Sequence, residues 1–315
     1  MAVSFTQSVK KEILAGLKGA PPCCEFAFLT GLIRTAGSVS LSNSGMGFAI
    51  AAENLDALKR ADVIVRKQFG IETELIEEKS VGRSRVRYAL RASSGEKVLT
   101  DCGIVVLDEQ GLRQISSGFD NYLIEEECCA KQFVKAVFLG AGYVTLPEET
   151  NKDGYHLEFA LTSEELEQPF TTVLQTFGFN PKKVLRKEEI VLYFKGSDEI
   201  GDLLSFLGAT KSMFRLQNTV AQRSLRNRAN RQTNCISANI DKTVNAAEKQ
   251  LIAIRAIEET VGLQSLPLNL RQAAELRKEN PSESLDELAA LSGMSKSGLN
   301  HRFRKILDIA SQSKK

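Results

Sequence analysis

Residues 28–41 read FLTGLIRTAGSVSL, and 105 positions later residues 133–146 read FVKAVFLGAGYVTL. Each stretch follows a double cysteine, Cys23-Cys24 in the first case and Cys128-Cys129 in the second. In both, an apolar pattern with helical spacing leads through Ala-Gly into a short apolar run that favours a β-strand. The chain therefore contains the same helix-to-strand corner twice, which predicts a duplicated structural unit.

The sequence around each corner extends the repeat. Each copy predicts a helix, a hairpin, a second helix, a second hairpin and a third helix, that is, an αββαββα unit. The copies occupy about 20–115 and 125–210, so we expect an α+β fold with a duplicated domain over residues 1–210. The elements predicted for the first copy are a helix at 23–36, a hairpin of GSVSL with GMGFAIAAEN, the helix NLDALKRADVIVRKQFG, a hairpin of IETELIEE with RVRYALRA, and a helix near GEKVLTDCGI.

The stretch from Leu29 to Gly37 resembles the LAGLIDADG signature of homing endonucleases and matches it at Leu, Gly, Leu, Ile and the final Gly. The resemblance implies that two signature helices pack side by side and that the two halves form a saddle-shaped sheet, which in that family sits on DNA. Small residues one turn apart fit this arrangement, because they allow helices to approach closely. They are Gly31 and Thr35 in the first helix, and Ala136 and Gly140 in the second.

The same family has an acidic residue just before the final glycine of each signature, where two carboxylates hold the divalent metals that activate water. Here those positions are Ala36 and Ala141, whose methyl groups cannot bind a metal. A fold does not keep an activity once its site residues are gone. We therefore expect a protein that is not an enzyme, with no catalytic residue, metal or cofactor. The alternative is a residual metal-dependent DNA endonuclease of homing-endonuclease type with relocated ligands.

Six cysteines raise the question of disulfides or a metal site. Adjacent cysteines lack the C-x-x-C spacing typical of zinc ligands, and the chain has only two histidines. We expect the cysteines to be small buried side chains in a reducing compartment. They are Cys23, Cys24, Cys102, Cys128, Cys129 and Cys235.

The composition is that of an ordinary globular protein, with 43% hydrophobic and 25% charged residues. No apolar run is long enough to span a bilayer, and the N-terminus lacks the apolar stretch and cleavage site of a secretory signal. It predicts instead an amphipathic helix capped at Ser4, with Gln7 three residues later. We expect a cytoplasmic protein that makes no membrane contact.

The net charge of +2 is unevenly distributed along the chain. Residues 1–210 hold 23 Lys and Arg against 29 Asp and Glu, whereas residues 211–315 hold 18 against 10. An excess of positive charge favours contact with a polyanion. We expect the C-terminal third to bind nucleic acid and the preceding residues to do so less strongly.

Within the duplicated domain, arginines alternate along the predicted strand at residues 83–87, and glutamates alternate along its predicted neighbour at residues 72–78. The arginines would form a stripe that fits phosphates, but cross-strand ion pairs explain both sets without DNA. Two interpretations stay open. The domain binds DNA, or it is a platform for a protein partner, such as another transcription regulator or a division protein.

Residues 211–242 are basic and polar and lack hydrophobic periodicity, as expected of a linker between domains. The stretch either stays solvated or lies along DNA, where phosphate contacts would position the protein without reading sequence. The candidate phosphate contacts are Arg223, Arg226, Arg228 and Arg231.

From residue 243 to 315 the pattern is helical. An apolar stripe at 244–261 predicts one helix, and LNLRQAAELRKENP predicts another that ends at Asn280-Pro281. Ser284 and Glu287 form a capping box that opens a third. The apolar residues predicted for the stripe are Val244, Ala247, Leu251, Ile254 and Val261.

The third helix begins a helix-turn-helix pattern. Ala289 is small where two helices cross, Gly293 can adopt the left-handed conformation of a tight turn, and Ser295 can cap the next helix. Leu299, together with Phe303 and Ile306, would then face inward.

The opposite face of that helix would enter the major groove of DNA. There Arg304 could bind guanine and Asn300 could bind adenine, each through two hydrogen bonds, and the helix N-terminus could contact a phosphate. The candidate DNA-binding residues are Ser295, Lys296, Ser297, Asn300, His301, Arg302, Arg304 and Lys305.

A duplicated LAGLIDADG-like domain without its carboxylates, followed by a basic linker and a helix-turn-helix domain, resembles the WhiA family of bacterial proteins. The most specific parts are the CC-x-x-x-F-x-x-G-L-I-R-x-A-G-S stretch and SGMSKSGLNHRFRKI. The resemblance implies a protein that binds double-stranded DNA as a transcriptional regulator or nucleoid-associated factor in cell division, chromosome segregation or sporulation.

Overall fold

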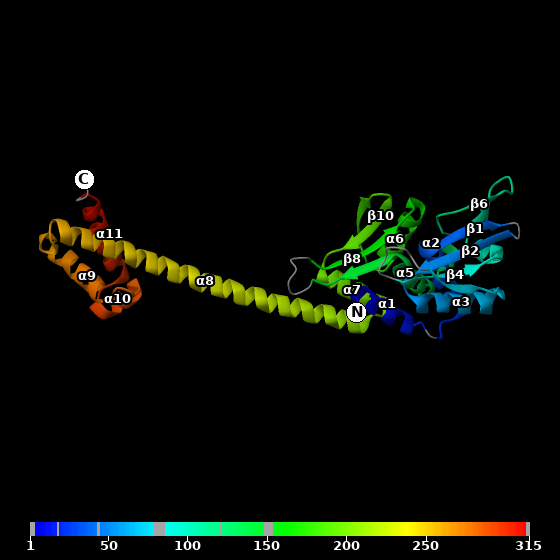
Figure 1. Ribbon diagram of the computed structural model, residues 1–315, viewed down its shortest axis with the longest axis horizontal. Coiled ribbons are helices and arrows are strands. Elements are labelled where there is room, and N and C mark those ends of the chain that lie inside the picture. Colours follow the sequence, from blue (N-terminus) through cyan, green and yellow to red (C-terminus); the bar gives the residue numbers. More distant parts are fainter. Residues whose placement is uncertain are drawn as a thin grey trace. The chain divides into compact units, whose positions relative to one another are not determined.

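The computed structural model describes residues 4–17, 19–42, 45–78, 86–119, 121–147 and 154–312. The chain forms two compact units, Met1–Gln222 and Arg223–Lys315. The first unit contains all the strands of Figure 1, and the described part of the second is helical. The expected α+β duplicated domain and the helix-turn-helix are both present.

The first repeat has the predicted order of elements. Its four strands form an antiparallel sheet in the order β1-β2-β4-β3. A helix before the repeat carries the expected capping box, in which the Ser4 hydroxyl accepts from the backbone N–H of Gln7 at 3.2 Å. The elements are α1 (Phe5–Ala15), α2 (Pro22–Ala36), β1 (Gly37–Ser42), β2 (Gly45–Ala52), α3 (Leu55–Phe69), β3 (Glu74–Glu78), β4 (Arg87–Ala92) and α4 (Glu96–Asp101).

The second repeat has the same order, and its sheet is β7-β8-β10-β9. A small ribbon of β5 and β6 and a short 3₁₀ helix connect the repeats, which the sequence pattern did not predict. The elements are β5 (Val105–Leu107), β6 (Arg113–Ile115), η1 (Asn121–Ile124), α5 (Glu127–Ala141), β7 (Gly142–Thr145), β8 (His156–Leu161), α6 (Glu164–Thr176), β9 (Lys182–Arg186), β10 (Glu189–Phe194) and α7 (Ser197–Leu207).

Helices α2 and α5 make the most extensive helix–helix contact of the described residues, and they run between the two sheets in Figure 1. A Cβ atom added to Gly31 would lie 2.9 Å from the Cβ of Ala136, so the backbones approach as closely as the small residues allow. Gly140 in turn faces Thr35. The predicted close packing of the signature helices is therefore confirmed.

Each signature helix passes directly into a strand. The backbone N–H of Gly37 donates a hydrogen bond to the carbonyl of Ile33 and caps the C-terminus of α2. The backbone N–H of Gly142 caps α5 in the same way, through the carbonyl of Phe138. Both glycines are extended, and each lies so close to the helix carbonyl that a side chain would collide with it. Close approach, not a positive φ, makes glycine necessary at both corners.

The basic stretch is helical. Helix α8 runs without a break from Thr210 to Thr260, so residues 211–242 are not a separate irregular linker, and the helix predicted from residue 243 begins much earlier. The Glu12 carboxylate caps its start, accepting from the backbone N–H of Lys211 at 2.8 Å and from the Ser212 hydroxyl at 2.6 Å.

The helices of the second unit enclose a core of their own. In the predicted apolar stripe, Ile254 and Ala247 are buried and Leu251 is partly buried. The prediction is wrong at Val244 and at Val261, which follows the end of α8, because these two residues are 56% and 55% exposed. None of the described helices is long and apolar enough to cross a lipid bilayer. The elements after α8 are η2 (Leu263–Ser265), α9 (Leu268–Glu279), α10 (Leu285–Ser292) and α11 (Lys296–Gln312).

Candidate nucleic-acid interface

The turn between α10 and α11 has the predicted geometry. Ser284 and Glu287 cap α10 reciprocally, with distances of 3.3 and 2.7 Å. Gly293 follows with φ 66° and ψ 13°, a left-handed conformation that glycine adopts without strain. The Ser295 hydroxyl then accepts from the backbone N–H of Gly298 at 3.1 Å and caps α11. These local signals set the start and direction of α11.

One face of α11 is anchored in the core of the second unit. Leu299, Phe303 and Ile306 are at most 1% exposed, and they pack with Leu288 of α10. This face was predicted from the helical spacing. Because it is fully buried, the rotation of α11 is fixed, and so is the set of side chains that it presents on the outside.

A buried arginine, which the sequence analysis missed, holds the other helices against α11. Arg277 is 1% exposed, and its guanidinium lies 5.5 Å from the ring centre of Phe303. It donates to the Gln250 side chain at 3.0 Å and to the carbonyls of Asn280 and Glu283 at 3.3 and 2.5 Å. Burial lowers the pKa of Arg277.

The outward side of α11 contains most of the predicted DNA contacts. At 100° per residue, Ser297, Asn300, His301, Arg304 and Lys305 fall within an arc of about 140° opposite the buried face. All but Asn300, which is partly buried, are exposed. Two cations and an amide thus share one surface of a fixed helix, a combination suited to phosphates and base edges.

Two predicted contacts lie at the margins of this arc and interact within the protein. Lys296 forms an ion pair with Asp286 of α10 at 2.5 Å. Arg302 is partly buried, and its guanidinium is directed at the sulfur of Met294 in the turn. Their positions on the helix place both beside the buried face. The structure therefore groups five of the eight candidates and sets Lys296 and Arg302 apart, with Ser295 in the capping position.

The four arginines of the basic stretch lie on α8 and do not form a single stripe. At 100° per residue they spread over about 200° of the helix circumference. Arg228 and Arg231 are exposed, and the Nε of Arg231 donates to the carbonyl of Asn227 at 3.2 Å. One phosphate backbone could contact only some of Arg223, Arg226, Arg228 and Arg231 at a time.

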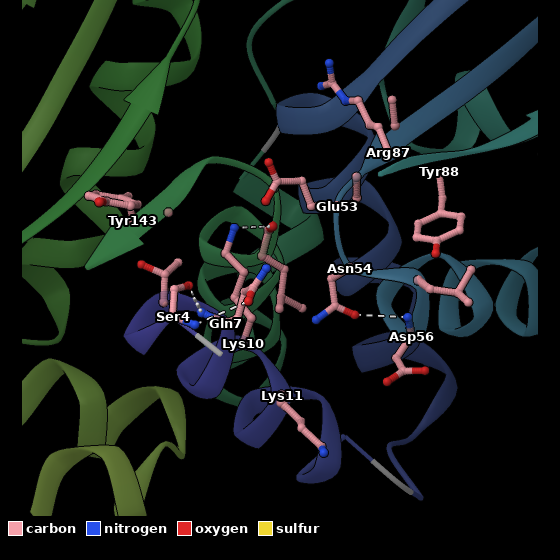
Figure 2. A pocket seen from close by; sticks show the side chains of 17 residues that line it. Ser4, Gln7, Lys10, Lys11, Glu53, Asn54, Asp56, Arg87, Tyr88 and Tyr143 are labelled. Atoms are coloured by element: carbon pink, nitrogen blue, oxygen red, sulfur yellow. Dashed lines mark hydrogen bonds between the residues drawn. The ribbon is translucent and has the colours of Figure 1, made fainter. Parts of the chain in front are cut away.

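In the first unit, the corner positions Ala36 and Ala141 end α2 and α5 with methyl side chains. A pocket beside the second corner is lined by Gly140, Gly142 and Lys10 of α1. Figure 2 shows Lys10 among the side chains that line it. Lys10 donates to the carbonyl of Leu139 at 2.9 Å, and burial lowers its pKa to about 8. The ammonium group of Lys10 therefore lies beside the last turn of α5.

Some of the charged groups on the sheets of the first unit are paired with one another. Arg91 of β4 pairs with Glu78 of β3 at 2.9 Å, and Arg186 of β9 pairs with Glu158 of β8 at 3.0 Å. Of the predicted arginine stripe, residues 83 and 85 lie outside the described residues, and Arg87 is opposite Glu78 in the ladder. Cross-strand pairing thus accounts for part of the alternating charge.

The cysteine prediction was wrong for half of the set. Cys23, Cys128 and Cys235 are exposed, whereas Cys24, Cys102 and Cys129 are buried. All six are free thiols.

Comparison with known families accounts for nearly the whole chain. Residues 22–105 match the WhiA N-terminal LAGLIDADG-like domain, residues 130–226 match the WhiA LAGLIDADG-like domain, and residues 229–310 match the WhiA C-terminal HTH domain. Together the three models cover both repeats and the helix-turn-helix.

Full-length relatives show the same similarity. The "Probable cell division protein WhiA" of Clostridium botulinum (strain Eklund 17B / Type B) is 34% identical over 318 residues, covering 98% of each chain. That of Bacillus thuringiensis (strain Al Hakam) is 36% identical over 313 residues, covering 98% of this chain and 96% of the relative.

Solved structures show the same fold. Full-length DUF199/WhiA from Thermatoga maritima has a TM-score of 0.58 and 23% identity, covering 98% of this chain and 99% of that one. The N-terminal LAGLIDADG domain of DUF199/WhiA has a TM-score of 0.50 and 18% identity, covering 69% and 98%.

Proposed function

We propose that this chain, which belongs to the WhiA family, binds duplex DNA sequence-specifically through α11 and does so without catalysis. The observation that carries the proposal is the arc of α11, where Asn300, Arg304 and Lys305 stand opposite a face buried to 1% exposure or less. A helix fixed on one side and polar and cationic on the other is suited to the major groove.

The division of labour along α11 follows from chemistry. Arg304 and Asn300 have the donors and acceptors for two-point contacts with guanine and adenine. Lys305, at one edge of the arc, and His301, beside it, would reach phosphates. The N-terminus of α11 after Ser295 offers backbone N–H groups to another phosphate. To contact DNA, Lys296 would have to break its ion pair with Asp286, and Arg302 would have to break its contact with Met294. We therefore propose that both contribute less to the DNA-binding free energy than the residues of the arc.

In this proposal the first unit is a non-catalytic scaffold. Its two corners carry Ala36 and Ala141 where the metal-binding carboxylates would be, and Lys10 lies near the second corner. The ion pairs on its sheets favour a platform for a protein partner, such as a regulator or a division protein, over a second DNA clamp. The proposed domain limits are 1–210 and 243–315, joined by the basic part of α8.

The names of the relatives suggest the process. Because they are called probable cell division proteins, we propose that this chain acts on the nucleoid in the cytoplasm as a regulator or nucleoid-associated factor of division, chromosome segregation or sporulation. DNA binding through α11 is the step that links it to the chromosome.

The test begins with genome-wide mapping of the DNA bound in cells, which supplies a preferred site. Binding of the purified full chain to that site is then measured by fluorescence anisotropy and footprinting. We expect Arg304→Ala and Asn300→Ala each to weaken binding by roughly 5- to 150-fold, the range for loss of one two-point base contact.

Lys249→Ala is the matched control, because Lys249 is an exposed cation of the same unit on α8. It should leave affinity and footprint unchanged. Equal protection of the site by the wild type and by the Asn300→Ala/Arg304→Ala double variant, with a folded protein shown by circular dichroism, would refute the proposal.

A further inference from the structure

The two double cysteines meet in space. Their four Sγ atoms all lie within 4.8 Å of one another, although the two pairs are far apart in sequence. We call this group the four-thiol cluster. Its members are Cys23, Cys24, Cys128 and Cys129.

The cluster follows from the duplicated architecture. Each cysteine pair occupies the second and third positions of a signature helix, α2 in the first repeat and α5 in the second. Because α2 and α5 pack against each other, their first turns bring both pairs together. Adjacent cysteines on one helix need no C-x-x-C spacing when the other two ligands come from a facing helix.

We propose that the four-thiol cluster is a tetrathiolate site for one Zn²⁺ ion, which fastens the first turn of α2 to the first turn of α5. A zinc ion with Zn–S bonds near 2.3 Å requires sulfur–sulfur separations of about 3.8 Å. All four sulfurs lie within 4.8 Å of one another, so the largest separation exceeds this value by about 1 Å. An iron–sulfur cluster would need wider spacing, because several iron and sulfide atoms must lie between its cysteines.

Burial and access suit a structural site with an entry path. Cys24 and Cys129 are 2% and 4% exposed, whereas Cys23 and Cys128 reach the surface. The two buried cysteines are thus fixed by the core, and the ion can enter from solvent past the two exposed ones. The thiol of Cys24 already interacts with those of Cys128 and Cys129 across the helix pair.

Positive charge near the cluster offsets part of the negative charge of a zinc–thiolate complex. Zinc displaces one proton from each thiol and leaves a complex of net charge −2. The positive ends of the two helices and the nearby Lys135, which interacts with Cys24, offset that charge.

The site lies at the end of α2 and α5 opposite the alanine corners, because the cysteines are in the first turn of each helix and Ala36 and Ala141 end them. The metal is therefore structural and separate from the position of the endonuclease ligands. Its role is to join the two repeats, and it is independent of DNA binding by α11.

The full chain is purified under reducing conditions, incubated with Zn²⁺, freed of excess metal and analysed by mass spectrometry for zinc. We expect one zinc per chain. Replacement by Co²⁺ should give the intense visible and sulfur-to-metal absorption of a tetrahedral thiolate site. Removing the metal with a strong chelator should lower the melting temperature of the first unit.

The variants Cys23→Ser and Cys128→Ser remove surface ligands without opening the core, and each should lose the zinc and the cobalt spectrum while circular dichroism stays native. Cys235→Ser, an exposed thiol on α8, is the control and should keep both. Absence of zinc in the wild type, or zinc retained by both ligand variants, would overturn the proposal.

Discussion

The sheets of the first unit and helix α11 of the second both carry many charged side chains, but they use them differently. On the sheets, Glu78 pairs with an arginine of the adjacent strand, and Glu158 pairs with an arginine two strands away. On α11, Arg304 and Lys305 are exposed. Charge satisfied inside a fold stabilises it, whereas charge that stands on a fixed outer surface is available to a partner. We therefore assign DNA recognition to α11.

The largest expected effect compares two arginines of the same unit. Arg277→Met should destabilise the second unit by about 3 kcal/mol, because it leaves the carbonyls of Asn280 and Glu283 and the Gln250 side chain without their donor. Arg304→Ala should leave that stability nearly unchanged. Hydrogen exchange by mass spectrometry over residues 250–310 measures both. Equal protection of amide hydrogens from exchange in the two variants would show that the buried Arg277 stabilises the second unit no more than the exposed Arg304 does.

An intermediate effect concerns acid sensitivity of the first unit. Burial opposes ionisation of Glu25, but Lys67, Gln68 and Arg60 outweigh it and lower its pKa. A lowered folded-state pKa contributes stability that is present above the unfolded value of about 4.3 and is lost as the pH falls through the folded value. The free energy of unfolding of the wild type, measured with urea, should therefore decrease below about pH 4.3.

The variant Glu25→Gln tests the cause. It should lose about 2 kcal/mol at pH 7, because Arg60 and Lys67 then face a neutral amide in a buried site. It should also show a shallower loss between pH 5 and pH 3. Glu72→Gln, at an 87% exposed side chain, should match the wild type. An acid profile of Glu25→Gln that parallels the wild type would contradict the assignment.

The smallest effect separates two lysines of α11. Lys305→Ala should reduce the slope of log affinity against log salt by about 1, as expected when one phosphate contact is lost. Lys296→Ala should change it less, because Lys296 is already paired with Asp286. Anisotropy titrations over a series of salt concentrations measure both slopes. A larger change for Lys296 would reverse their proposed roles.

The sequence predicted those features whose signals are local. The helix-to-strand corners, the capping boxes at Ser4 and Ser284 and the turn at Gly293 depend on residues within a few positions of each other, and each is present. The duplicated αββαββα order followed from the alternation of helical and strand patterns in the same way.

Other features depended on contacts that the linear pattern does not contain. Helix α8 between residues 224 and 242 is exposed on all sides, so it has no hydrophobic periodicity to predict it. The four-thiol cluster forms only because α2 and α5 pack against each other. Arginine is rarely buried, so the residue type of Arg277 suggested a surface position. In each case tertiary packing, not local preference, decided the outcome.

The central claim is that this chain binds DNA without cutting it. Supercoiled plasmid that carries the preferred site is incubated with the full chain and Mg²⁺ or Mn²⁺ at concentrations that give full protection in a footprint. Because Ala36 and Ala141 replace the metal-binding carboxylates, we predict that the plasmid stays supercoiled while the site is protected. Metal-dependent nicking that a chelator abolishes, and that grows with protein concentration, would contradict the account.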